Sequence, residues 1–426
     1  MRKNLHPEKL FHRDVFLTAV FAMLFYFVLQ FFFHLVNTHF VDPLTTSIKD
    51  FEFSDIYFSQ YAKHQAPPDT NIILINTGID RPAFRNDLAR MILVLKKFKP
   101  KVIAVDHYFP EKDSIEKNLT ADSLLQVAVA SFPELISICR YYPDSPDANY
   151  CRSASDKKIN LVNEGYSNLV ARNNETVRYF MPYIRKKING EEKHFESFAL
   201  KTVKAFDSTA YQYTINNNKS ETAEWIQYGR KDNYWYEPPE ILRFEKSDTA
   251  TQWLNDSAAF RNAVDHKIVL FGFLGMDKKL KTLEDIYVTP SDKILGGVPT
   301  PGTYGVEIQA HIVSTLLGKN FIWIARPRLL HLIGFLLLLP SVYLFLWLYV
   351  KHPAFFHAAS RAYQIVISAG VVVISLLLFG ECKIDISAKT VIMPLLLSVD
   401  AIFLFDFLVQ QLKKKFHFKT YYSHEH

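Results

Sequence analysis

Glycine and short polar residues follow three apolar runs in the middle of the chain, where they are placed to bind a ligand. The runs cover residues 71–76, 101–106 and 267–271. If all three are parallel strands, their carboxyl ends meet at one edge of a sheet, which is where open α/β sheets bind ligands. The candidate binding residues at this edge are Thr77, Gly78, Asp106 and Gly272.

A later loop supplies three more candidates, Asp285, Thr289 and Pro290, which can contribute to the same edge. The alternative interpretation is structural: Asp106 caps a loop, and Gly272 only permits a tight turn. The sequence leaves both interpretations open.

No catalytic or cofactor motif accompanies these residues. The stretch Gly272-Phe273-Leu274-Gly275 lacks the Lys-Ser/Thr ending of a Walker motif and the three-glycine pattern of dinucleotide sites. The chain also lacks a Gly-x-Ser-x-Gly elbow, a His-Glu-x-x-His pair and a Cys-His constellation. We therefore expect no enzyme, no cofactor and no metal, with an active site assembled from distant residues as the alternative.

The three cysteines are too few for a disulfide scaffold or a Cys-based zinc site. Cys139 and Cys151 would close a short loop in an oxidising compartment, and such a bridge contributes about 3 kcal/mol. In the alternative, Cys139 is only a small buried hydrophobic residue at the end of a strand.

The elements around these residues have the pattern of an α/β domain with a mostly parallel sheet. The run at 71–76 predicts a strand buried on both faces, and apolar residues between 84 and 98 recur with helical spacing. With the strand at 101–106 they form one right-handed βαβ unit. The other predicted elements are a helix at 121–131, strands at 135–138, 177–184, 225–228 and 267–271, a loop at 140–160, and a helix after Gly305.

Four apolar segments are long enough to cross a bilayer, so the fold class is the α/β domain plus a four-helix transmembrane region. One span is N-terminal and three are C-terminal, at residues 15–36, 328–350, 363–380 and 391–411. The first lacks a small-residue cleavage site and predicts an uncleaved anchor. The formal net charge of +6 comes without a dense basic patch, which excludes nucleic acid as a partner.

Basic residues indicate the orientation of these spans. Ten Lys and Arg residues lie before the first span, between the second and third spans, or after the last span. Only four Lys and Arg residues lie near the opposite ends of the spans. We therefore expect residues 1–14 and the basic tail 412–426 in the cytoplasm, and residues 37–327 outside it.

Two acids lie inside the last predicted span, where an ionised carboxylate costs about 3 kcal/mol. Asp400 is near its middle, and Asp406 projects from a different face. One hypothesis places Asp400 in a polar cluster with Gln364 or His331. In the alternative, Asp400 is protonated and donates a hydrogen bond to a neighbouring helix.

Six short blocks of residues in the central segment resemble blocks that occur in the same order in one protein family. The blocks are Ile72–Asn76 with the helix behind it, Val102–Phe109, Glu164–Ser167 followed by Thr176–Arg178, Asp265–Gly272, Asp285–Pro290 and Gly305–His311. Over roughly residues 42–325 the chain resembles the CHASE2 family of extracytoplasmic sensor domains. With one anchor before and three spans after, it resembles the sensor half of bacterial CHASE2 receptors, which implies the inner membrane and a periplasmic domain.

Two features depart from the family pattern. The family usually has an acidic residue and a Trp-Pro-Trp-like element after the first strand, where this chain reads Asn-Thr-Gly-Ile-Asp-Arg-Pro-Ala-Phe at 76–84. Such receptors commonly continue into a kinase, cyclase or phosphatase domain, whereas 15 residues follow Gln411 here. We therefore expect the output to come from another protein.

These observations predict a multi-pass receptor whose outer domain senses a small molecule or partner and signals through a separate output protein. The alternative function is a structural or assembly subunit of an envelope complex, with the same domain as a docking surface. The expected partners are the lipid bilayer and a signalling or envelope protein, and a homodimer is compatible with a receptor of this type.

Overall fold

The computed structural model describes residues 7–35, 52–62, 69–77, 84–109, 119–143, 150–153, 161, 163–169, 176–188, 190–218, 223–228, 257–275, 285–292, 301–416 and 420–422. The chain divides into two compact units. Residues 58–321 form the α/β unit, and residues 1–57 together with 322–426 form the helical unit.

A mostly parallel sheet organises the α/β unit, as the sequence predicts. Its strand order is β1-β10-β2-β3-β4, with β5 also paired to β3. Only β4 is antiparallel to its neighbour. The bounds are β1 Ile72–Asn76, β2 Val102–Val105, β3 Leu135–Tyr141, β4 Cys151–Ser153, β5 Glu164–Tyr166 and β10 Ile268–Gly272.

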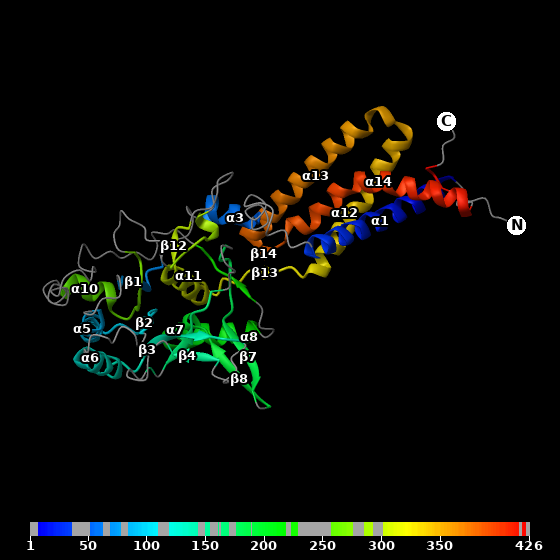
Figure 1. The fold of residues 1–426 in the computed structure, drawn as a ribbon. Coiled ribbons are helices and arrows are strands. Elements are labelled where there is room, and N and C mark those ends of the chain that lie inside the picture. Colours follow the sequence, from blue (N-terminus) through cyan, green and yellow to red (C-terminus); the bar gives the residue numbers. More distant parts are fainter. Residues whose placement is uncertain are drawn as a thin grey trace. The chain divides into compact units, whose positions relative to one another are not determined.

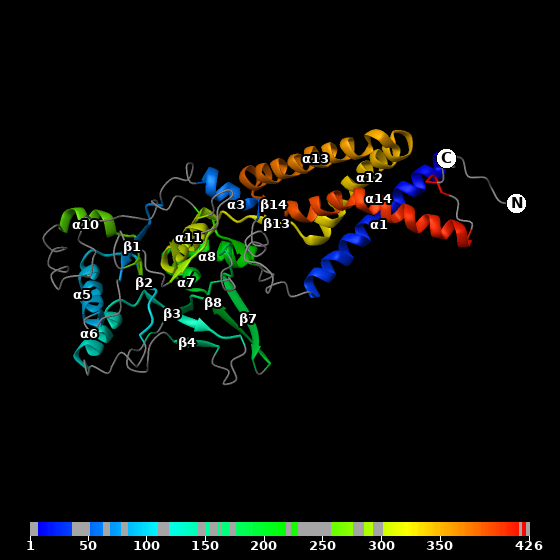
Figure 2. The same ribbon diagram turned by 45° about the horizontal axis from the view of Figure 1, so that its top comes forward.

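Helices cover both faces of this sheet (Figures 1 and 2). On one face α5 (Phe84–Lys97), α6 (Leu119–Ala130) and α10 (Ser257–Val264) pack against the strands. Leu88, Leu125 and Val264 meet Ile75 and Phe271 there in a buried core. On the other face α7 (Phe198–Phe206) and α11 (Gly305–Gly318) contact the strands. Burial from both sides explains why these strands are continuous apolar runs.

Shorter elements complete the α/β unit. They are a π-helix at Tyr57–Ala62 that begins in the helical unit, β6 (Tyr179–Phe180) paired with β9 (Glu224–Trp225), the hairpin of β7 (Tyr183–Ile188) and β8 (Glu191–Glu196), α8 (Ser208–Asn217), β11 (Ile286–Tyr287) paired with β12 (Thr303–Tyr304), and a 3-10 turn at Pro290–Asp292.

Two predicted elements are wrong in detail. The predicted loop at 140–160 contains the end of β3 and the whole of β4, because the polar residues of β4 find backbone partners along β3. The predicted strand at 177–184 is divided between β6 and β7, which belong to different sheets. Pro182 lies between them, and it has no N–H for a ladder hydrogen bond.

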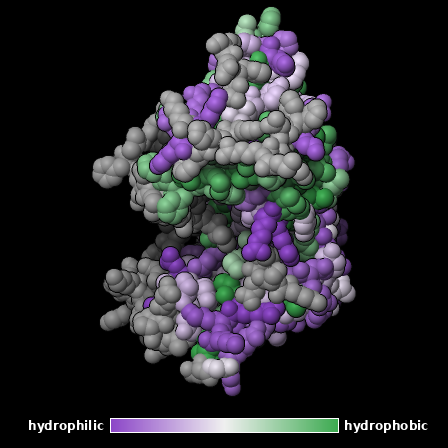
Figure 3. All heavy atoms as spheres, turned by 90° about the vertical axis from the view of Figure 1, so that its right-hand side faces the viewer, coloured by the Kyte–Doolittle hydropathy of each residue, from purple (hydrophilic) through white to green (hydrophobic). Residues whose placement is uncertain are grey.

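The helical unit contains four helices that are long and apolar enough to cross a membrane. Each begins before the span predicted for it, and α12, α13 and α14 also end after it, because the helices continue past the apolar residues. Their bounds are α1 Pro7–Leu35, α12 Pro327–Lys351, α13 Pro353–Cys382 and α14 Ala388–Phe416. Figure 3 shows hydrophobic residues gathered in a band, with hydrophilic residues on either side of it.

Small residues bring α1, α12 and α14 together. Ala19 and Ala22 of α1 and Ala401 of α14 are fully buried in one apolar cluster with Leu338 of α12. Small side chains let helix backbones approach closely, which is how helices associate in lipid.

The chain beyond α14 returns to the first turns of α1. The Asp14 carboxylate accepts hydrogen bonds from Thr420 Oγ1 at 2.7 Å and from the Tyr421 amide at 2.6 Å. Thr18 and Tyr422 are joined through their hydroxyl groups at 2.9 Å. Since α13 begins directly after α12 at Pro353, the start of α1, the α12–α13 turn and the end of α14 form one end of this unit.

A short parallel pair lies at the other end of the helical unit. β13 (Trp323–Ile324) precedes α12 and pairs with β14 (Ile384–Asp385), which joins α13 to α14. The short helix α3 (Ser54–Ile56) also contacts α13, where Tyr57 packs against Phe379. The segment that enters α12 is therefore tied to the α13–α14 hairpin.

Gly272 lets α11 approach the sheet, which predicts the effect of adding a side chain. A Cβ at position 272 would lie 2.5 Å from Cβ of Val306. Gly272→Ala should lower the free energy of unfolding by about 1–3 kcal/mol through overpacking. Thermal unfolding of the full chain in detergent measures this loss. Val306→Gly removes every side-chain atom that the new Cβ would meet, so the loss in the Gly272→Ala, Val306→Gly double variant should be smaller than the sum of the two single losses. Additive losses would contradict the contact.

Candidate functional site

The candidate site lies at the carboxyl edge of the sheet, where β10 ends between β1 and β2. The amide of Thr77 donates to the Gly272 carbonyl at 2.8 Å, and the amide of Asp106 donates to the Phe271 carbonyl at 2.8 Å. These bonds continue both ladders by one residue. Three of the sequence-predicted residues, Thr77, Asp106 and Gly272, are therefore brought together at one edge.

The connections make this edge a topological switch point of the sheet. The chain leaves β1 and β2 towards α5 and α6 on one face of the sheet, whereas it leaves β10 towards α11 on the other face. Open α/β sheets bind ligands where neighbouring strands connect to opposite faces.

Asp285 joins this edge through the first residue of α11. Its carbonyl accepts a hydrogen bond from the Gly305 amide at 3.1 Å, and its carboxylate lies against Gly305, 2.8 Å from where a Cβ would be. Asp285 also has a φ of 53°, in the left-handed region that few non-glycine residues occupy. The backbone is therefore held in an unfavourable conformation that presents the carboxylate at the start of α11.

The carboxyl groups of Asp106 and Asp285 interact electrostatically. Asp106 keeps a little solvent exposure but is closely surrounded by protein, and this desolvation, with a smaller effect from the charge of Asp285, raises its pKa to about 8. Asp285 reaches the surface, and desolvation raises its pKa to about 6 against the effect of hydrogen bonds from Tyr287 and Gly305. Two neighbouring carboxyl groups that resist ionisation favour a proton or a cationic group between them.

Two tyrosines and an arginine border the carboxyl pair. Desolvation and then the charge of Asp285 raise the pKa of Tyr287 to about 12. Desolvation raises the pKa of the exposed Tyr108, whose hydroxyl is hydrogen-bonded by Ser167, and the charge of Asp106 raises it further. The guanidinium of Arg140 lowers the pKa of both tyrosines. The border therefore offers hydrogen-bond donors and one positive charge.

The remaining predicted residues occupy different surroundings. Thr77 is 1% exposed and its hydroxyl has no hydrogen-bond partner, but it follows Asn76 in an extended strand end and so points to the α5 face. Gly78 lies outside the described residues. Thr289 and Pro290 are buried, and the Thr289 hydroxyl donates to Asp292 at 2.7 Å and lies 3.2 Å from the hydroxyl of Thr303 in β12.

Sequence reasoning missed Asn76, Tyr108, Arg140, Ser167 and Tyr287. Asn76 anchors the chain after β10: its side chain donates to the Gly275 carbonyl at 2.9 Å and accepts from the Leu274 amide at 2.9 Å. The position of Asn76 at the end of an apolar run was a signal in the sequence that could have identified it as a site residue. Nothing in the sequence places Arg140 or Ser167 at this edge, because the pairing of β3 with β5 in the sheet is what brings them there.

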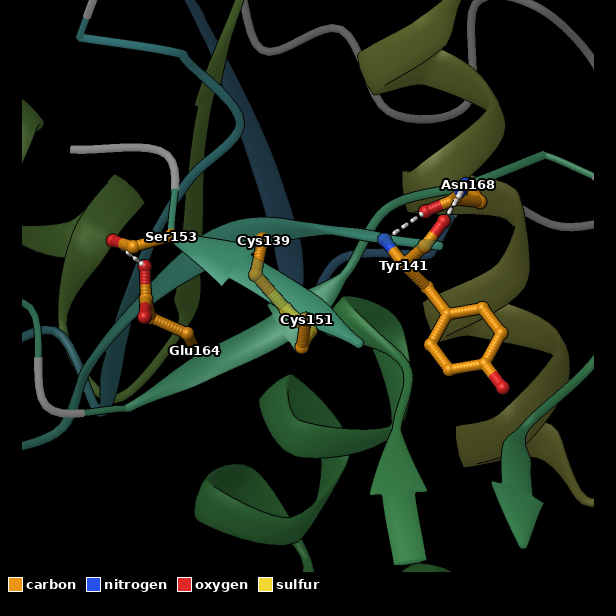
Figure 4. Close-up of a disulfide and its surroundings, with 6 residues drawn as sticks. All are labelled: Cys139, Tyr141, Cys151, Ser153, Glu164 and Asn168. Carbon is orange, nitrogen blue, oxygen red and sulfur yellow. Dashed lines mark hydrogen bonds between the residues drawn. A yellow bond between two sulfur atoms is a disulfide. The ribbon is translucent and has the colours of Figure 1, made fainter. Parts of the chain in front are cut away.

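The structure joins Cys139 and Cys151 in a disulfide between β3 and β4, with Cα atoms 5.5 Å apart (Figure 4). Two interactions support the strands on either side of the bridge. Asn168 hydrogen-bonds both the amide and the carbonyl of Tyr141, at 2.8 and 3.0 Å, and Ser153 donates to Glu164.

The intramembrane acids contact other helices. The Asp400 carboxylate lies 3.7 Å from the Arg361 guanidinium of α13, and Asp406 accepts a hydrogen bond from Tyr349 of α12 at 2.9 Å. Gln364 is linked to Asp400 through Arg361, which donates a hydrogen bond to Gln364 Oε1 at 3.0 Å. His331 packs instead against Phe27 of α1, which separates it from the predicted cluster.

A family model described as the CHASE2 domain matches residues 35–350, which is well over half of the chain. The chain belongs to the CHASE2 family. It is therefore a multi-span membrane protein with a CHASE2 sensor domain between its first and second spans. The comparisons with curated proteins and with solved structures found no match. Within the described residues, no group of three or more His, Cys, Asp or Glu side chains is placed to hold a metal ion.

The raised pKa of Asp106 predicts how stability changes with pH. An aspartate whose pKa rises from 3.8 to about 8 on folding destabilises the folded state as the pH rises between these values, because the unfolded chain ionises first. The slope in this window is about 1.4 kcal/mol per pH unit, so relative to the wild type Asp106→Asn should gain up to about 4 kcal/mol of stability between pH 5 and pH 8. Thermal unfolding at both pH values measures this gain. The exposed Glu134→Gln serves as control, and an equal gain in the control would contradict the assignment.

Proposed function

We propose that this CHASE2 protein is a receptor that binds a small polar molecule, or a polar group of a partner protein, at the carboxyl edge of its sheet. It acts by binding rather than by catalysis, and it signals through a separate output protein. The observation that supports this most is the pair of Asp106 and Asp285 at the end of β10, where both carboxyl groups have raised pKa values. A ligand with a positive charge or hydrogen-bond donors would relieve the cost of ionising them.

The path of the chain supports transmission from this edge. α11 begins at Gly305, against Asp285, and residues 319–326 join its end to α12. Within that segment β13 is hydrogen-bonded to β14, so a displacement of α11 acts on α12 and on the α13–α14 hairpin together. Small helix shifts of this kind are a common signalling movement. A ligand causes one only through its difference in affinity for the two states.

We further propose that both termini are cytoplasmic and that the α/β unit lies outside a bacterial inner membrane. One end of the helical unit is formed by the start of α1, the α12–α13 turn and the end of α14. It holds the basic residues Lys9, Arg13, Lys351, Lys413 and Lys415, as the cytoplasmic side of a membrane protein does. The Cys139–Cys151 disulfide supports the same orientation, because disulfides persist in oxidising compartments.

Protease treatment of spheroplasts tests this orientation. The α/β unit should be digested, whereas tags at Met1 and His426 should survive until the membrane is permeabilised. Digestion of both tags in intact spheroplasts, with the α/β unit protected, would reverse the proposed topology.

A thermal-shift screen of the purified full chain against small polar metabolites tests the receptor function. A ligand at 100 times its dissociation constant stabilises the folded state by about 2.7 kcal/mol. We expect at least one compound to do so with the wild type and to lose the effect with Asp285→Asn, while Asp265→Asn behaves as the wild type. No stabilising compound, together with a constitutive stoichiometric complex in membranes, would favour the assembly-subunit function instead.

A further inference from the structure

An ion pair in the membrane-spanning helices faces outward from the helical unit. Arg361 of α13 and Asp400 of α14 are 3.7 Å apart, and their side chains remain 54% and 55% exposed. Charged side chains within spans normally face the interior of a bundle, because exposure to lipid is costly. The predicted third span begins at residue 363, but α13 begins at Pro353 and its apolar span takes in Arg361. This half-exposed pair therefore lacks the protein cover that a membrane position calls for.

The pair is held in place by the helices beneath it. Arg361 donates to Gln364 Oε1 at 3.0 Å, and the Gln364 amide donates to the Leu395 carbonyl of α14 at 2.8 Å. Gln364 itself is 2% exposed. The orientation of the two charges at the surface is therefore set before any partner arrives.

Asp400 also lies within a regular stripe of exposed residues along α14. Residues at positions 393, 396, 400, 403 and 407 alternate in spacing by three and four. Met393, Leu396, Phe403 and Phe407 are 48%, 38%, 37% and 60% exposed. This is the heptad spacing of a helix that packs against another helix, and one polar residue within such a stripe specifies the register and the number of helices.

We propose that the Arg361–Asp400 pair and this stripe form the interface between two copies of the chain. The charges on this face are self-complementary. Two copies in one membrane are related by a two-fold axis along the membrane normal, which places Arg361 of each copy opposite Asp400 of the other. Each residue then has two opposite charges nearby, and both are removed from lipid. An interface of this type is isologous, as in most symmetric dimers.

Charge exchange between two differently tagged full-length chains tests this interface. Arg361→Glu alone or Asp400→Lys alone places like charges across the homodimer, so co-purification from co-expressing membranes should fall at least tenfold. Together, the Arg361→Glu chain and the Asp400→Lys chain face each other with opposite charges at both positions. They should therefore co-purify at close to the wild-type level.

The double variant Arg361→Glu, Asp400→Lys on a single chain controls for misfolding. It restores the ion pair within the chain and across a dimer with itself, but not across a dimer with the wild type. It should co-purify with itself and not with the wild type. If the ion pair acts only within one chain, the double variant should co-purify equally well with itself and with the wild type.

Disulfide trapping gives a second readout that does not depend on charge. In a Cys382→Ser background, Met393→Cys should form cross-linked dimers in oxidised membranes, because position 393 lies on the stripe. The matched control is Ile374→Cys, which is 57% exposed on the side of α13 away from Arg361. The control should remain monomeric.

Three results would overturn the interface: wild-type chains that fail to co-purify, single charge variants that still self-associate, or equal cross-linking at positions 393 and 374. A different membrane protein captured by the wild type in place of its own copy would assign the surface to that partner instead.

Discussion

The pairing of β10 between β1 and β2 is the constraint on which the α/β unit depends. Residues 268–272 are inserted between two strands that precede them by more than 160 positions, with hydrogen bonds to both neighbours. This insertion places Gly272 beside Asp106 and turns the chain towards α11 on the opposite face. Without it, β1 and β2 would be adjacent and their connections would leave on the same face, so the switch point would be lost.

The close approach at Gly272 and the strained backbone at Asp285 serve the same arrangement. The first lets α11 lie against the sheet, and the second places a carboxylate at the first residue of that helix. A site with two reluctant carboxyl groups is less stable than one with neutral residues, and such a cost is often found at functional sites. A similar cost is found in the helical unit, where the charged side chains of Arg361 and Asp400 remain half-exposed although the helices hold them in place.

Much of the architecture could be predicted from the amino-acid pattern. Long apolar runs gave the four spans, because the thickness of the bilayer core requires about 20 apolar residues. Strands buried on both faces gave β1, β2 and β10, because such strands have no polar alternation. The boundaries were less certain: α13 begins well before its predicted span, and β4 was assigned to a loop because short polar strands have no periodicity of their own.

The sequence by itself determined the fold class, the membrane spans and the family, since all three depend on local composition or on ordered blocks of residues. Only the tertiary structure decided which residues meet. It brought Asp106, Gly272 and Asp285 to one edge, buried Thr289 and Pro290, and paired Asp400 with Arg361 rather than with His331. These outcomes depend on strand order and helix packing between positions far apart in the chain, and spacing along a single sequence does not record them.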